Sequence, residues 1–136
     1  MKIEDPALVR EFRLMACELC GSRWDVVGHH LLRKGMGGGS QIDHRWNMIA
    51  LCKQHHDWIH SRGAGGDVRV PTKAQLWQIV AEREKQPAED LEAVMRCLWR
   101  LPRGCRPWEF DRETAGLTPV QREWVVRFME RPGRAR

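Results

Sequence analysis

Apolar residues in the second half of the chain recur at helical spacing. Pro87 can open a helix, and the apolar positions after it fall at i, i+3, i+4 and i+7: Leu91, Val94, Met95 and Leu98. This spacing places them on one face, as in an amphipathic helix that packs against a core. We therefore expect a helix that starts near Pro87.

Two capping signals predict further helices in the same region. Thr72 is followed three residues later by Gln75, a pair whose hydroxyl and amide side chains can satisfy the first turn of a helix. Thr118 and Gln121 repeat this spacing. Apolar residues at helical spacing follow both pairs: Leu76, Ile79 and Val80 after the first, and Trp124, Val125, Phe128 and Met129 after the second.

The first half has a mixed pattern. Asp5 can cap a short helix over residues 5–15, with Pro6 at its first position. Alternating residues over 24–27 and a Gly-rich segment over 35–40 predict a β-hairpin with a flexible tip. Strands in this half and helices in the other half indicate an α+β fold.

Composition and charge narrow the class of protein. The 136 residues carry 23 basic and 18 acidic side chains, a formal net charge of +5. Disorder and collagen-like repeats are excluded, and the basic excess favours a polyanionic partner. No stretch approaches the roughly 18 apolar residues of a membrane span, and residues 1–16 carry charges where a signal peptide needs an apolar run. We expect a cytoplasmic protein with no membrane partner.

The spacing of three cysteines and one histidine predicts a metal site. Cys17 and Cys20 are two residues apart and precede Gly21, and Cys52 and His55 repeat that spacing. Two intervening residues let a tight turn direct both donors at one ion. The four residues therefore predict a structural Zn²⁺ site of Cys₃His type, whose binding energy would stabilise a small Gly-rich region.

The other two cysteines lack this spacing. Cys97 and Cys105 have no partner at ligand distance in the sequence, and we predict that they are buried or idle thiols. A Cys-x-x-Cys pair by itself also occurs in redox proteins and as core thiols, which is the alternative for Cys17 and Cys20.

All six histidines lie within residues 29–60. The spacing of His56 and His60 predicts that they share one face of a helix over 54–61, where both can bind one metal ion.

A pair of adjacent histidines precedes that helix. On a strand, His29 and His30 point to opposite faces. One imidazole from this pair and two from the helix would give a three-nitrogen site with open positions, typical of catalytic metals. The other is then free to act as a base, since an ordinary imidazole titrates near pH 6.5.

Together these motifs resemble an HNH endonuclease with the ββα-metal fold, of the zinc-knuckle type common in phage and bacterial genomes. The resemblance covers about residues 17–60. It rests on separately placed elements: Cys17 and Cys20, His29 and His30, the run Arg33-Lys34-Gly35-Met36-Gly37-Gly38, Asn47, the segment Leu51-Cys52-x₂-His55-His56, and His60. It implies an N-terminal helix (1–16), a nuclease core with the zinc knuckle (17–62), a linker (63–71) and a helical C-terminal region (72–136).

The resemblance also implies an activity, the hydrolysis of DNA phosphodiester bonds with little sequence specificity. His30 matches the general base that activates water, and Asn47 matches the residue that fixes the loop and positions this base. His29, His56 and His60 match the ligands of one catalytic divalent cation, which would neutralise charge on the phosphate.

Two departures from the family pattern bear on the metals. Where many relatives have Cys-His, this chain has His55 and His56, which leaves open which imidazole binds which metal. His29 stands where many relatives have Asp, so Mn²⁺, Ni²⁺ or Zn²⁺ can compete with Mg²⁺.

Basic residues near these motifs are candidates for DNA binding. Arg33, Lys34 and Arg45 are expected to contact phosphates without base specificity, with ordinary surface charge as the alternative. Asp43 and His44 form a rival acid–histidine pair. Only two residues separate His44 from Asn47, too few for the loop that a hairpin site needs, so we expect His44 to be a solvated loop residue.

The main alternative function is a zinc-finger-like module that binds nucleic acid without cutting it. It accounts for the charge and the cysteine spacing but leaves the paired histidines and Asn47 unexplained. The helical region could also recruit a nuclease to phage packaging or recombination proteins, or clamp duplex DNA, and charge and periodicity do not choose between these roles.

Overall fold

The computed structural model of the chain describes residues 1–33, 41–62 and 70–130, with the side chains of residues 61 and 62 left aside. Within these residues the fold is α+β, with helices in both halves and two small two-stranded sheets. In chain order the elements are β1 (Lys2–Ile3), α1 (Pro6–Arg13), β2 (Val27–His30), β3 (Gln41–Ile42), the 3-10 helix η1 (Arg45–Asn47), β4 (Met48–Leu51), α2 (Lys53–Arg62), α3 (Lys73–Glu84), α4 (Ala88–Arg100), α5 (Pro107–Thr114) and α6 (Pro119–Glu130).

Some predicted features fall outside the described residues. These are Lys34, the Gly-rich segment over 35–40 and most of the predicted linker over 63–71.

The predicted antiparallel strand pair is formed by β2 and β4, with His30 opposite Met48. All of β4 is buried. Strand β2 begins at Val27 and not at Trp24, where the alternating pattern begins. Asp25 has a φ of 49°, a left-handed turn conformation that interrupts a strand. A second, parallel pair joins β1 to β3. The sequence did not predict it, because two residues on each side are too few to form a pattern.

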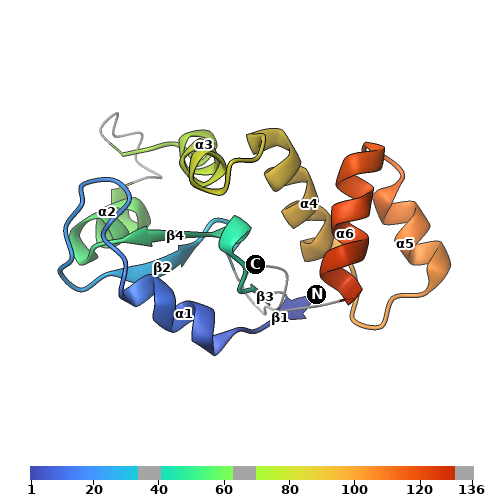
Figure 1. Cartoon of the computed structure of the whole chain (residues 1–136), viewed down its shortest axis with the longest axis horizontal. Helices are drawn as coiled ribbons and strands as arrows, with labels where there is room; N and C mark the ends of the chain where they lie inside the picture. The colour runs from blue at the N-terminus through green and yellow to red at the C-terminus, as the bar shows by residue number, and fades with distance from the viewer. Residues whose placement is uncertain (34–40, 63–69, 131–136) are drawn as a thin grey trace.

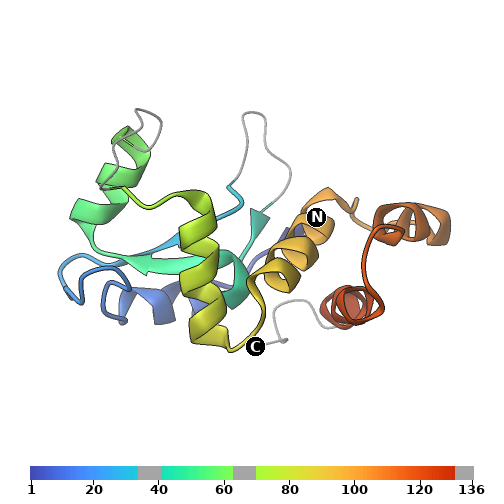
Figure 2. The ribbon, with the colours of Figure 1, turned by 90° about the horizontal axis from the view of Figure 1, so that it is seen from above.

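The strand pair β2–β4 lies between α1 and α3, as the two ribbon views agree (Figures 1 and 2). Helix α1 starts where predicted: Asp5 caps it by accepting a hydrogen bond from the backbone N–H of Leu8. Leu8 and Phe12 are buried on the helix face that packs against the strands. Phe12 lies close to β2, and a Cβ at Gly28 would be only 3.1 Å from Cβ of Phe12.

In the second half of the chain, two helices begin at the predicted capping pairs. The reciprocal pair of Thr72 and Gln75 is present at the start of α3, and Thr118 and Gln121 form the same bonds before α6. The apolar stripe of α4 is buried, as predicted. Helix α5 was not predicted, because half of its side chains are exposed and its only buried residue is Thr114. No described helix is both long and apolar enough to cross a membrane.

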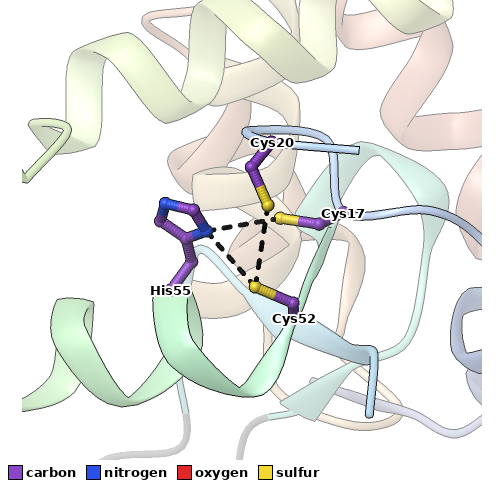
Figure 3. A group of neighbouring side chains, drawn as sticks. All are labelled: Cys17, Cys20, Cys52 and His55. Atoms are coloured by element: carbon purple, nitrogen blue, oxygen red, sulfur yellow. Dashed lines mark hydrogen bonds between the residues drawn. The ribbon is translucent and has the colours of Figure 1, made fainter. Parts of the chain in front are cut away.

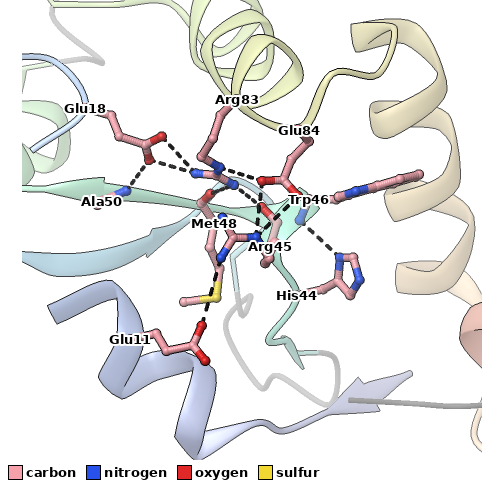
Figure 4. A network of polar contacts seen from close by, with 9 residues as sticks. All are labelled: Glu11, Glu18, His44, Arg45, Trp46, Met48, Ala50, Arg83 and Glu84. Carbon is pink, nitrogen blue, oxygen red and sulfur yellow. Dashed lines mark hydrogen bonds and ion pairs between the residues drawn. The ribbon is translucent and has the colours of Figure 1, made fainter. Parts of the chain in front are cut away.

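The two halves share one hydrophobic core, which runs from Ile3 to Phe128. A largely buried polar network also joins them (Figure 4). The guanidinium of Arg83 on α3 donates to both carboxylate oxygens of Glu18, at 3.0 and 2.7 Å, and to the carbonyls of Arg45 and Met48. Glu18 in turn accepts the backbone N–H of Ala50 at 2.7 Å. Arg83 therefore holds α3 against β4, the strand that pairs with β2.

Candidate metal centres

The four predicted zinc ligands lie together at one end of the strand pair (Figure 3). Cys20 Sγ is 3.8 Å from Cys52 Sγ, and the Nδ1 atom of His55 is 3.7 Å from Cys17 Sγ and 3.3 Å from Cys52 Sγ. All four ligand atoms are within 4.8 Å of one another. These four residues form the cysteine centre.

The cysteine centre fits a tetrahedral zinc ion. With Zn–S bonds of about 2.3 Å and Zn–N bonds of about 2.05 Å, the edges of the tetrahedron are about 3.8 Å between sulfurs and about 3.6 Å between sulfur and nitrogen. The observed distances are close to these values. The four residues could therefore hold a metal such as zinc.

Local backbone geometry brings the ligands together. Gly21 has a φ of 79°, and its N–H donates to the carbonyl of Cys17 at 2.8 Å, so the chain turns tightly between the first two cysteines. Cys52 directly follows β4, and His55 lies in the first turn of α2. Burial raises the pKa of the Cys17 thiol, but backbone hydrogen bonds outweigh it and the pKa is lowered. A lowered pKa favours the thiolate, which is the form that binds metal.

A second cluster, the histidine centre, contains His29 from β2 and His56 and His60 from α2. The Nε2 atoms of His56 and His60 are 3.0 Å apart, and one ring nitrogen from each residue lies within 4.8 Å of the others. Two ligands at about 2.1 Å from one ion are about 3.0 Å apart when they occupy adjacent octahedral positions. The three side chains could therefore hold a metal ion, and this is the grouping expected from the sequence.

Burial keeps these imidazoles neutral. It lowers the pKa of His29 to about 3, and the neighbouring His60 and His56 add to the effect. Burial also lowers the pKa values of His56 and His60. Neutral imidazole is the form that binds metal, so no proton has to leave these rings at neutral pH.

One contact at the histidine centre has to change when a metal binds. Nη1 of Arg33 lies 2.6 Å from Nδ1 of His60, so that nitrogen accepts a hydrogen bond. A neutral imidazole that binds a metal through Nε2 carries its hydrogen on Nδ1. Arg33 must therefore leave Nδ1 when His60 binds a metal through Nε2.

His30 follows His29 on β2 but is not part of the histidine centre. Its side chain is partly exposed, and its Nε2 atom is 2.7 Å from Oδ1 of Asp43. A cleft opens beside it, lined by His29, His30, His56 and His60 together with Leu32, Arg33 and Gln41. His30 and the histidine centre thus line the same cleft.

Asn47 is fully buried, and its side chain binds backbone on two other segments. Its Oδ1 accepts from the N–H of Leu32 at 2.8 Å, and its Nδ2 donates to the carbonyls of Leu32 and Ile42. Its own carbonyl accepts from the N–H of Leu31. Asn47 therefore fixes the chain directly after His30.

The structure shows the partners of Arg45 and corrects the expectation for His44. Arg45 forms ion pairs with Glu84 and Glu11 instead of facing the cleft. The prediction of a solvated His44 was wrong. This residue is buried, its Nδ1 accepts the N–H of Trp46, and its ring lies 4.6 Å from the ring of Phe128 on α6.

Sequence reasoning missed two residues near the cleft. It paired Asp43 with its neighbour His44, whereas the fold pairs it with His30, which is distant in sequence. It also considered Lys73 only as part of a helical stretch that could clamp duplex DNA, whereas the fold puts this residue in the first turn of α3, where its charge contributes to the lowered pKa of His29. A single lysine carries no signal of its own, so only the fold could reveal it.

The two predicted idle thiols, Cys97 and Cys105, form no disulfide. Cys97 is buried, and burial raises its pKa to about 11.

No protein-family model, no curated protein and no solved structure matches the chain.

Proposed function

We propose that this protein is a metal-dependent endonuclease of the HNH type that hydrolyses DNA phosphodiester bonds. The observation that carries the proposal is that His30 and the histidine centre line the same cleft from two different elements. A binding module needs neither a base beside a metal centre nor open ligand positions. The cysteine centre, at the other end of α2, would hold the framework with zinc.

In the proposed reaction His30 takes a proton from a water molecule, whose oxygen attacks the phosphorus atom. The bond between phosphorus and the 3′ oxygen breaks, and the leaving oxygen takes up a proton from solvent. When bound, a divalent cation at the histidine centre supplies positive charge beside the phosphate and the leaving oxygen. Asn47 holds the chain after His30 in place during these steps.

Basic side chains around the cleft would bind the substrate. Once Nε2 of His60 is a metal ligand, Arg33 is released from Nδ1 and can donate to a phosphate oxygen. Lys73 adds a second positive charge close to His29. Arg45 is left out of the proposed set because its guanidinium is paired with Glu84. Phosphate contacts of this kind give affinity without sequence specificity.

The test is a plasmid-nicking assay with purified wild type and His30→Ala, in EDTA and with added Mg²⁺, Mn²⁺, Ni²⁺ or Zn²⁺. We expect metal-dependent nicking that falls by at least about 100-fold in His30→Ala, because a general base contributes roughly 10²–10⁴-fold. Gln78→Ala, an exposed change on α3, is the control and should cut like wild type. If wild type and His30→Ala shift the plasmid's mobility but neither cuts it, the protein is a binding module and the proposal fails.

A further inference from the structure

Asp43 is a buried carboxylate that accepts three N–H groups. Its side chain is 4% exposed. Oδ1 lies 2.7 Å from Nε2 of His30 and accepts from Nε2 of Gln41 at 3.2 Å, while Oδ2 accepts from the backbone N–H of Asp5 at 3.0 Å. Asp5 is itself fixed, because it is the cap of α1. Both oxygens of Asp43 are therefore held in place by hydrogen bonds.

This arrangement determines which nitrogen of His30 carries the hydrogen. A carboxylate only accepts hydrogen bonds, so the Nε2 atom that faces Asp43 must be the donor. In a neutral imidazole the other nitrogen, Nδ1, then keeps its lone pair. A base needs that lone pair on the side that meets water.

We propose that Asp43 is a positioning residue that fixes the tautomer and the ring orientation of His30, and so directs the Nδ1 lone pair into the cleft. The inference rests on the proposed role of His30 as the base. Asp43 does not line the cleft, so it acts through His30 and not on the substrate. The substrate contacts remain those of Arg33 and Lys73.

The variant Asp43→Asn tests this inference because it keeps the shape and removes one acceptor. The backbone N–H of Asp5 needs an oxygen, so the new amide nitrogen must face His30. That nitrogen donates, so Nε2 of His30 becomes the acceptor and the hydrogen moves to Nδ1. The lone pair then points away from the cleft, as when an asparagine replaces the carboxylate behind a catalytic histidine.

The first measurement is the ¹⁵N spectrum of the His30 ring at pH 8, where an ordinary imidazole is neutral. We expect the Nε2–H tautomer in wild type and the Nδ1–H tautomer in Asp43→Asn. The matched control is Asp90→Asn on α4, where the carboxylate accepts from Nε2 of Gln121 at 2.8 Å. This control should leave the His30 spectrum unchanged.

The second measurement separates kcat from KM on plasmid DNA. We expect kcat of Asp43→Asn to fall by at least about 100-fold, because a base with the wrong tautomer is lost, with KM within about threefold of wild type. A purely structural role would instead lower the fraction of active protein and leave the His30 tautomer as in wild type.

Two results would overturn the inference: an Nδ1–H tautomer in wild type, or an unchanged tautomer and kcat in Asp43→Asn. The wild-type spectrum needs no variant, so it decides even if Asp43→Asn does not fold. If wild type never cuts DNA but the spectra change as expected, the proposed nuclease function fails while the control of His30 by Asp43 stands.

Discussion

The side chain of Asn47 forms a two-way hydrogen-bonded pair with the backbone of Leu32. Oδ1 accepts from the Leu32 N–H at 2.8 Å, and Nδ2 donates to the Leu32 carbonyl at 3.2 Å. Nδ2 also reaches the carbonyl of Ile42 at 2.9 Å, so one buried amide links the chain after β2 to β3. A primary amide supplies this combination of one acceptor and two donors.

Asn47→Ala should therefore weaken both the fold and the proposed reaction. Backbone groups at Leu32 and Ile42 lose their partners in the interior, at a cost of about 1–3 kcal/mol for a buried unsatisfied group. Urea unfolding measures this cost, and the plasmid assay should show slower nicking even where the variant is fully folded. We expect Asn47→Asp to be destabilised as well, because its second carboxylate oxygen would face the carbonyls of Leu32 and Ile42. An unfolding free energy of Asn47→Ala equal to that of wild type would contradict the structural role of these hydrogen bonds.

Cys52→Ala should release zinc and destabilise the protein. The thiol lies 3.8 Å from Cys20 Sγ and 3.3 Å from Nδ1 of His55, so its loss leaves three ligands. Structural zinc contributes roughly 10–16 kcal/mol of binding free energy in small domains, so we expect a loss of several kcal/mol. Zinc retained after dialysis and the thermal midpoint are the measurements. Cys105→Ala removes a cysteine outside the centre and should match wild type; equal zinc content in both variants would exclude the cysteine centre.

Gly28→Ala should destabilise the site-bearing strand. A Cβ at this position would lie 2.5 Å from Cε of Met48 and 3.1 Å from Cβ of Phe12. The methyl end of Met48 can rotate away, but Phe12 is held by α1, so we expect a cost of about 1–3 kcal/mol. The matched control is Gly116→Ala, where the new Cβ meets nothing within 4 Å and stability should stay within about 1 kcal/mol of wild type. Chemical denaturation of both variants provides the comparison.

Arg83→Met should loosen the contact between α3 and β4. The side chains of Arg83 and Glu18 are 15% and 12% exposed, so the change leaves a largely buried carboxylate without its cation. Breaking a buried ion pair costs about 3–5 kcal/mol. Arg96→Met breaks a surface pair with Glu92 at the same N···O distance of 2.7 Å and should cost less than about 1 kcal/mol. Equal unfolding free energies for the two variants would show that the network contributes no more than a surface pair.

The sequence by itself determined the features that depend on short stretches of chain. Two-residue spacing was enough to group Cys17 with Cys20, and the i, i+4 spacing put His56 and His60 on one helix face. Thr72 and Gln75 marked the start of α3 in the same way. In each case the geometry of one turn brings the side chains together, so the pattern predicts the contact.

Only the tertiary structure decided the partners of the buried polar groups. Asp43 was paired with the adjacent His44 in the sequence, yet β3 and β2 bring it to His30, while His44 packs against α6. Arg83 likewise reaches Glu18 across 65 positions of the chain. A buried carboxylate or guanidinium needs a partner in the interior, and which segment supplies it depends on how distant elements pack. Spacing along the chain carries no information about that packing.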